Sequence, residues 1–153
     1  MSGIFGCASK NSCIGDLFYG TDYLSHLGTK ISGMAVLTEN EIKRVIHSLA
    51  SSYFRTKFES EFPDLEGSLG IGVISDYEVQ PILMRSHLGL FGLVTVLKIN
   101  NIMNPTELVA KLICERDSIS QGIAYAQECI EGFCTMLLVS DNGEIFAARN
   151  RLG

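Results

Sequence analysis

Cysteine and histidine, the side chains that most often bind metals or act as nucleophiles, are scattered along this chain. None of the cysteines forms a CxxC pair; they are Cys7, Cys13, Cys114, Cys129 and Cys134. The three histidines are equally dispersed, and His47 and His87 have no acidic or histidine partner at the spacing of metal ligands. We therefore interpret the cysteines as reduced, packed thiols and expect no metal, no disulfide and no cofactor.

Two carboxylates and two further side chains have both a chemical and a structural interpretation. Asp76 and Glu78 alternate after an apolar stretch, a pattern that could serve general acid–base catalysis. Alternating acids at the end of a strand are more often a solvated turn, and this is the interpretation we prefer. We likewise interpret Cys7 as a packing thiol rather than a nucleophile, and His26 as a residue stabilised by the end of a helix. None of these residues identifies a function alone.

The elements that must position these residues follow from the apolar patterning. Strands are predicted at 3–8, 31–38, 68–74, 80–86, 90–99, 133–140 and 144–149, with 42–46 a strand or the start of an irregular segment. Helices are predicted over 14–27, after Asn104-Pro105, and after Ser118, which forms a capping box with Gln121. Residues 48–57 are ambiguous between helix and loop. Hairpin-joined strands and grouped helices predict an α+β domain.

The composition is that of one folded domain. Of the 153 residues, 46% are hydrophobic and 19% charged, which excludes extended disorder. No apolar run reaches the ~18 residues of a membrane span. The net charge of −5 and the lack of a basic patch argue against a nucleic-acid partner. The N-terminus has no signal-peptide pattern, so we expect a cytoplasmic protein.

Several segments, in order along the chain, resemble the class II glutamine amidotransferases. The opening 2–6, Ser-Gly-Ile-Phe-Gly, resembles that family's start after removal of methionine, Cys-Gly-Ile-x-Gly. The family's QHRGQESAGIA, GIGHTRYST, AQP, D-S/T-E and AARDPLG motifs resemble residues 25–35, 70–78, 80–81, 106–108 and 147–153. Within the family the sequence is most similar to the N-terminal domain of amidophosphoribosyltransferase. The resemblance implies a four-layer αββα sandwich of two antiparallel sheets, the N-terminal nucleophile hydrolase fold.

The resemblance also implies a chemistry. In that family an N-terminal cysteine thiolate attacks the side-chain amide of glutamine, and its own α-amine serves as the base. Asn and backbone donors hold the oxyanion, an Arg and an Asp hold the carboxylate and ammonium of glutamine, and ammonia passes to a second active site. Here Ser2 stands at the nucleophile position. Met1 precedes a small residue, so its removal is expected, and this removal frees the α-amine of Ser2.

The sequence departs from the family at each of the four functional positions. Ser2 replaces the cysteine, and Ser75 replaces the arginine, whose bidentate fork a hydroxyl cannot supply. The oxyanion motif HNGN aligns with residues 97–100, where its Asn-Gly pair is lost. The ammonium-binding Asp falls at Pro105 or is deleted. We interpret these departures as a retained scaffold that has lost its glutaminase.

We therefore expect residues 1–153 to form a glutamine amidotransferase-like domain. It would be the N-terminal fragment of a longer amidophosphoribosyltransferase homologue in purine nucleotide synthesis, with a C-terminal phosphoribosyltransferase-like domain as its partner. Ser2 is the candidate catalytic residue, and binding of glutamine is doubtful. Two alternatives stay open: an active N-terminal serine amidohydrolase that uses Ser2, and a non-catalytic dimerisation or regulatory module. A homo-oligomer is a further open alternative.

Overall fold

The first of two sheets contains the N-terminal strand at its border. The computed structural model describes residues 1–28, 30–39, 41–97, 99 and 101–151. The first sheet is antiparallel, in the order β1-β4-β2-β3; its strands are β1 (Ser2–Ala8), β2 (Ile31–Leu37), β3 (Ile42–Ser48) and β4 (Leu69–Ser75). The register places Ser2 opposite Ser75, so the first residue of β1 faces the last residue of β4.

The second sheet is a meander of consecutive antiparallel strands. Its members are β5 (Ile82–Ser86), β6 (Gly89–Leu97), β7 (Cys134–Ser140) and β8 (Ile145–Arg149), in the order β5-β6-β7-β8. The turn between β7 and β8 contains Asn142-Gly143, and Gly143 has a φ of 82°. A positive φ favours glycine, which is why this dipeptide predicted the hairpin correctly.

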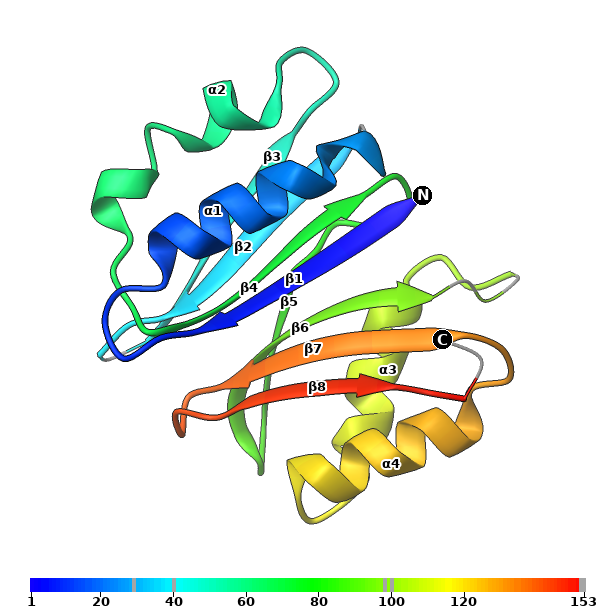
Figure 1. The fold of residues 1–153 in the computed structure, drawn as a ribbon. Coiled ribbons are helices and arrows are strands. Elements are labelled where there is room, and N and C mark those ends of the chain that lie inside the picture. The colour runs from blue at the N-terminus through cyan, green and yellow to red at the C-terminus, as the bar shows by residue number, and fades with distance from the viewer. Residues whose placement is uncertain (29, 40, 98, 100, 152–153) are drawn as a thin grey trace.

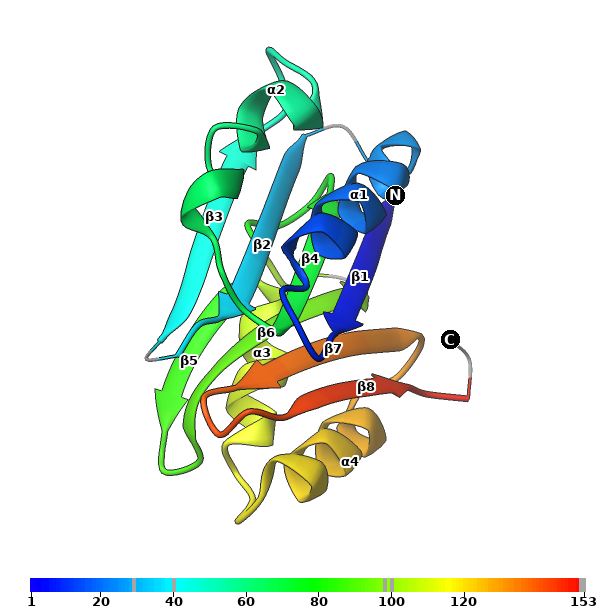
Figure 2. The ribbon, with the colours of Figure 1, turned by 60° about the vertical axis from the view of Figure 1, so that its left-hand side comes forward.

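Helices cover the outer face of each sheet (Figure 1). Helix α1 (Ile14–Tyr23), the 3-10 turn Leu24–His26 and the short α2 (Phe54–Phe58) lie over the first sheet, followed by a 3-10 turn at Phe62–Asp64. Helices α3 (Pro105–Ile113) and α4 (Ile119–Cys129) lie over the second sheet. The turned view in Figure 2 shows the same order of layers. The expected four-layer α+β architecture is therefore confirmed.

Three apolar clusters fill the spaces between these layers. The central cluster lies between the two sheets, and its fully buried members include Ala35, Ile71, Val73, Val94 and Val139. One outer cluster joins α1 and α2 to the first sheet, and the other joins α3 and α4 to the second. A strand that is buried on both faces has apolar residues at successive positions rather than at every second one. This explains the nearly continuous apolar sequences of 69–75 and 90–97.

The element boundaries differ from the sequence predictions at two informative places. The helix predicted over 14–27 is α-helical only to Tyr23 and then tightens into the 3-10 turn. The strand predicted from Gln80 begins at Ile82, after Pro81, which has no backbone N–H to donate to a ladder. The ambiguous segment 48–57 contains the start of α2. The Ser118 cap is confirmed: its hydroxyl accepts a hydrogen bond from Gln121 N at 3.3 Å.

Among the described residues, no helix is long and apolar enough to cross a membrane.

Candidate functional site

Ser2 lies at one end of the space between the two sheets. Side chains alternate along a strand, so Ser2 shares its face with Ile4, which packs against the central cluster. The Ser2 hydroxyl donates a hydrogen bond of 3.4 Å to Ser75 Oγ. Ser75 follows Ile71 and Val73 along the same face of β4 and is 1% exposed. The sequence-predicted nucleophile position and the position of the missing arginine are thus in direct contact.

The Ser75 hydroxyl also organises the turn that leaves β4. Its Oγ accepts hydrogen bonds from Tyr77 N at 3.1 Å and from Glu78 N at 3.2 Å. A serine hydroxyl that accepts backbone amides two and three residues on is a common way to reverse the chain. Ser75 therefore has two local backbone partners in the turn that follows it, in addition to Ser2.

Asp76 lies at the outer side of this turn and pairs with the N-terminus. Its Oδ2 is 2.8 Å from the ammonium nitrogen of Met1, in a solvent-exposed ion pair. The hydrogen bond with Asp76 raises the pKa of this ammonium above its usual value, and the nearby Tyr77 acts in the same direction. Removal of Met1 would remove this pair and place the new ammonium on Ser2, one residue closer to Ser75.

Glu78 is the main correction to the sequence interpretation. The residue is 8% exposed, so it is not part of a solvated turn. Its Oε1 accepts from Thr106 N at 2.8 Å, and its Oε2 accepts from Thr106 Oγ1 at 2.7 Å and from Gln80 Nε2 at 3.4 Å. Thr106 is the second residue of α3, where backbone N–H groups have no helical partner and a carboxylate is stabilised. The carboxylate thus caps this helix.

Gln80 and Thr95 complete a buried polar network that Glu78 connects to the Ser75 hydroxyl. Gln80 Oε1 accepts from Thr95 N at 2.7 Å, and its Nε2 donates to Thr95 O at 3.1 Å. The hydroxyls of Thr95 and Thr106 lie 2.6 Å apart. The network therefore joins the β4–β5 turn, β6 and α3. Sequence reasoning missed it, although Gln80-Pro81 had been noted as a motif, because its members are far apart in the chain.

The other residues considered from the sequence lie in structural roles or outside the described residues. Of the segment aligned with the oxyanion motif, positions 98 and 100 are outside the residues that the structure describes. Pro105 begins α3 and is buried. Cys7 packs against the cluster under α1, and His26 Nδ1 lies 2.7 Å from Tyr23 O. These placements agree with the interpretations of Cys7 and His26 as structural residues.

Two buried thiols are held in the neutral form. Cys13 and Cys134 are each 0% exposed, and burial raises the pKa of both thiols to about 11. A thiol is a nucleophile only as the thiolate, so neither is activated at neutral pH. In the described part of the chain, no group of three or more His, Cys, Asp and Glu side chains is arranged to hold a metal ion.

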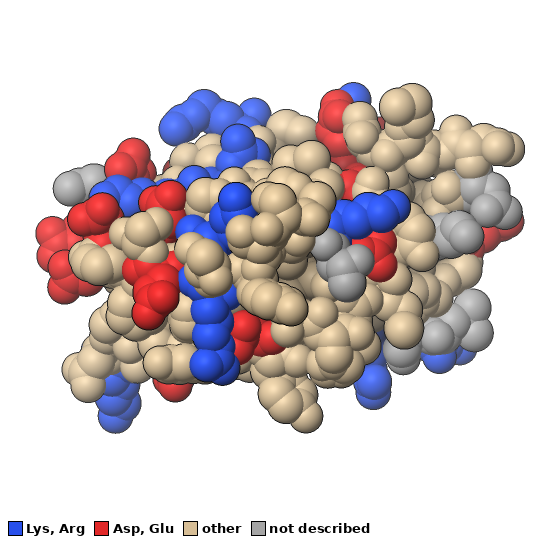
Figure 3. Space-filling model, turned by 90° about the horizontal axis from the view of Figure 1, so that it is seen from above, with Lys and Arg blue, Asp and Glu red and all other residues tan. Residues whose placement is uncertain are grey.

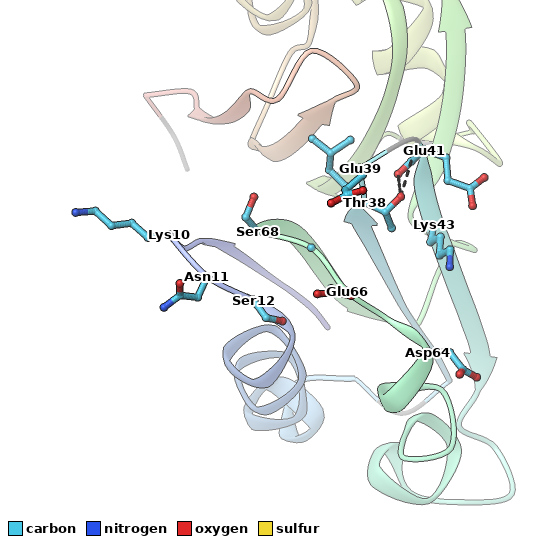
Figure 4. A pocket seen from close by; sticks show the side chains of 12 residues that line it. Lys10, Asn11, Ser12, Thr38, Glu39, Glu41, Lys43, Asp64, Glu66 and Ser68 are labelled. Carbon is cyan, nitrogen blue, oxygen red and sulfur yellow. Dashed lines mark hydrogen bonds between the residues drawn. The ribbon is translucent and has the colours of Figure 1, made fainter.

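Ser2 lines neither of two open cavities in the described part of the chain. The first, of about 820 Å³, is lined by the segments after β1, between β2 and β3 and before β4, at the end of the first sheet opposite Ser2 (Figure 4). Its lining includes the acidic Glu39, Glu41, Asp64 and Glu66 and the basic Lys10 and Lys43. The second, of about 900 Å³, lies between the end of α1 and the segment 49–56. The face in Figure 3 carries interspersed basic and acidic side chains.

No protein-family model matches the sequence, and no curated protein matches it. Solved structures do share its fold. The chain is similar to glutamine phosphoribosylpyrophosphate amidotransferase from B. subtilis, with a TM-score of 0.79 and 17% identity over 98% of this chain. A structure described as the allosteric regulatory enzyme of purine biosynthesis gives a TM-score of 0.78, also with 17% identity, over 97% of this chain. This chain spans 37% of each of those chains, and it has the amidotransferase fold expected from the resemblance.

Proposed function

We propose that this chain is the amidotransferase-like domain of an amidophosphoribosyltransferase homologue and that it no longer hydrolyses glutamine. The fold shared with phosphoribosylpyrophosphate amidotransferase supports the first part. The surroundings of Ser75 support the second. A partner phosphoribosyltransferase-like domain and a cytoplasmic location belong to the same proposal.

The observation that carries the proposal is the absence of a carboxylate-binding group at Ser75. An arginine would offer a glutamine α-carboxylate two parallel, charge-assisted hydrogen bonds. The Ser75 hydroxyl is neutral and already accepts hydrogen bonds from two backbone amides. The next residue, Asp76, is paired with the Met1 ammonium and supplies no positive charge in place of the arginine. The position therefore disfavours the ligand that the family binds there.

The nucleophile position supports the same conclusion. A serine hydroxyl is a weaker nucleophile than a cysteine thiolate and depends more strongly on an adjacent base. The base in this fold would be the α-amine of Ser2, which remains in a peptide bond until Met1 is removed. The nearest hydroxyl partner of Ser2 is Ser75, which is not a base.

The experiment is a glutaminase assay on wild-type protein and on Ser2→Cys, after mass spectrometry has shown that Met1 is removed from both. Ser2→Cys restores the stronger nucleophile and leaves Ser75 unchanged. We expect no glutamate release from either protein, and no glutamine binding at millimolar concentration by calorimetry. Glutamine hydrolysis by Ser2→Cys with saturation at millimolar substrate would show that the site still holds glutamine, and the proposal would be wrong.

An N-terminal serine amidohydrolase is the second candidate. It is favoured by the placement of Ser2 at the end of the space between the sheets, with its hydroxyl turned toward the buried end of β4. Its signature would be hydrolysis of an amide by the wild-type protein that is lost in Ser2→Ala. A comparison of the wild-type protein with Ser2→Ala therefore separates this candidate from the preferred one.

A further inference from the structure

The Asp76 carboxylate is a fixed acceptor beside the start of the chain. Its Oδ2 lies 2.8 Å from the Met1 nitrogen. The Asp76 side chain is 21% exposed, whereas that of Met1 is 80% exposed. The surrounding protein therefore holds the carboxylate in place, and the ammonium group reaches it from the surface. This position thus binds an α-ammonium in the structure.

The N-terminus stays close to Asp76 when it is shortened by one residue. The β1–β4 register places Ser2 opposite Ser75, the residue that precedes Asp76. The nitrogens of consecutive residues in an extended chain are at most ~3.8 Å apart, so the Ser2 nitrogen lies within about 6.6 Å of Asp76 Oδ2. No peptide bond precedes a free N-terminal residue. Its amine can therefore turn about the Ser2 backbone toward the carboxylate.

The turn after β4 favours a protonated amine at this place. The hydrogen bond with Asp76 is the main cause that raises the pKa of the Met1 ammonium, and Tyr77 acts in the same direction. The next carboxylate, Glu78, is directed away from the N-terminus, because both of its oxygens accept hydrogen bonds from Thr106. Asp76 is therefore the acid of this turn that faces the chain terminus.

Two further titratable side chains come from the segment between α1 and β2. His26 Nδ1 lies 2.7 Å from a backbone carbonyl oxygen of α1, so its ring is directed to that helix. Lys30 precedes Ile31, which lies opposite Ser75, so Lys30 follows on the side of β4 away from β1. A carboxylate has two accepting oxygens, so a lysine on that side can share Asp76 with an α-ammonium.

We propose that Asp76 binds the α-ammonium of Ser2 once Met1 is removed, and so withholds the free amine that an N-terminal nucleophile needs as its base. This inference rests on the proposed function, since it explains why the site is inactive although a hydroxyl remains at position 2. A carboxylate paired with an ammonium is a much weaker base than a free amine and does not replace it. Asp76 acts through the amine and is a positioning residue.

The test is a titration of the Ser2 amine in proteins that are shown by mass to begin at an unmodified Ser2. The chemical shifts of the labelled Ser2 carbons follow the amine by NMR. Asp76→Asn removes the charge and keeps the shape, and Asp76→Glu restores the charge. Both replace a partly exposed side chain and leave the Glu78 network intact, so both variants should fold.

Asp117→Asn is the matched control, because it removes one negative charge from another part of the surface. Thr106, at the start of α3, binds Glu78, whereas Asp117 follows the far end of that helix. The nine residues of α3 span about 13 Å, which exceeds the screening length of about 8–10 Å at physiological salt. The control therefore separates a local pair from the effect of net charge.

We expect the midpoint of the Ser2 titration to fall in Asp76→Asn, to return toward the wild-type value in Asp76→Glu, and to stay unchanged in Asp117→Asn. Periodate cleavage is a second readout, since it requires a free amine next to the Ser2 hydroxyl. At neutral pH its rate should rise about 1.4- to 5-fold in Asp76→Asn, the range expected from the loss of an exposed ion pair.

Three results would overturn the proposal. An unchanged midpoint in Asp76→Asn would show that Asp76 does not bind the amine. An equal fall in Asp117→Asn would assign the effect to net charge. A purified protein that keeps Met1 has no Ser2 ammonium to bind. The titration contains no glutamine, so it can fail while the glutaminase assay still gives no product. Glutamate release by the wild type would instead contradict the proposed function and leave the measured midpoints as they are.

Discussion

At the scale of single residues, the buried Glu78 carboxylate explains more of the local structure than the candidate nucleophile does. It accepts three hydrogen bonds, two of them from Thr106 at the start of α3. Its own N–H donates to the Ser75 hydroxyl, so one residue connects the helix to the end of β4. A sequence pattern of two acids in a short segment could not distinguish this buried carboxylate from the half-buried Asp76. The difference depends on α3, which comes from a distant part of the chain.

Replacing Glu78 should therefore destabilise the protein far more than replacing Asp76. Glu78→Ala leaves the amide and hydroxyl of Thr106 without their acceptor, and losing a charged, buried acceptor costs about 2–4 kcal/mol. Asp76→Ala removes an exposed pair with Met1 and should lower the urea midpoint much less than Glu78→Ala does. Urea unfolding followed by circular dichroism measures both. Equal midpoints for the two variants would contradict the network described above.

Because the Cys13 and Cys134 thiols are neutral in the folded protein, we predict that the protein loses stability at alkaline pH. Burial raises the pKa of Cys13 and Cys134 from 9.0 to about 11 in the folded protein. Below pH 9 both thiols keep their protons in the folded and in the unfolded protein, so the free energy of unfolding does not change. Between pH 9 and 11 only the unfolded state releases them, so the free energy of unfolding falls, by about 1.4 kcal/mol per pKa unit for each thiol.

This prediction is checked by urea unfolding at a series of pH values. Cys13→Ala and Cys134→Ala should each flatten the decline between pH 9 and 11, whatever their effect at neutral pH. Cys129→Ala is the control, since that thiol is exposed. An unchanged slope in both buried variants would show that other groups cause the alkaline decline.

At the scale of elements, glycine is required where another backbone segment packs directly against a strand. A Cβ atom on Gly33, in β2, would lie 2.1 Å from the carbonyl oxygen of Gln80. The turn after β4 therefore packs directly on β2, which holds the end of the candidate site in place. Gly15 in α1 is the opposite case, because a Cβ there would meet no atom within 4 Å.

The same substitution should therefore have opposite effects at these two glycines. Gly33→Ala forces the Gln80 backbone to move and should lower stability by about 1–3 kcal/mol. Gly15→Ala improves helix propensity and should raise stability by about 0.5–1 kcal/mol. Thermal unfolding of both variants measures the difference. A Gly33→Ala protein as stable as wild type would mean that the turn does not pack on β2 as described.

Most elements could be predicted from the sequence, because their signals are local. The Asn142-Gly143 turn, the Ser118 cap and the apolar runs of β4 and β6 each depend on residues within one segment. The β4–β5 turn was not predictable in the same way. Its shape depends on Ser75 accepting two amides and on Glu78 and Gln80 reaching Thr95 and Thr106.

At the scale of the whole molecule, the layered fold is shared with solved amidotransferase structures although few residues are identical. The central cluster between the sheets is entirely apolar, and the helices on each outer face pack on separate apolar clusters. Apolar patterning of this kind tolerates extensive sequence change, in keeping with a TM-score of 0.79 at 17% identity. Under the proposed function, catalysis has no such tolerance, because it would depend on the individual side chains at positions 2 and 75.

The central claim is that the scaffold remains while the glutaminase does not, and glutamine hydrolysis tests it most directly. The measurement is glutamate release by purified wild-type protein that has lost Met1, with Ser2→Ala prepared in the same way. We predict that the two proteins give the same rate, indistinguishable from the uncatalysed reaction. Glutamate release by the wild type that disappears in Ser2→Ala would contradict the account and establish Ser2 as a working N-terminal nucleophile.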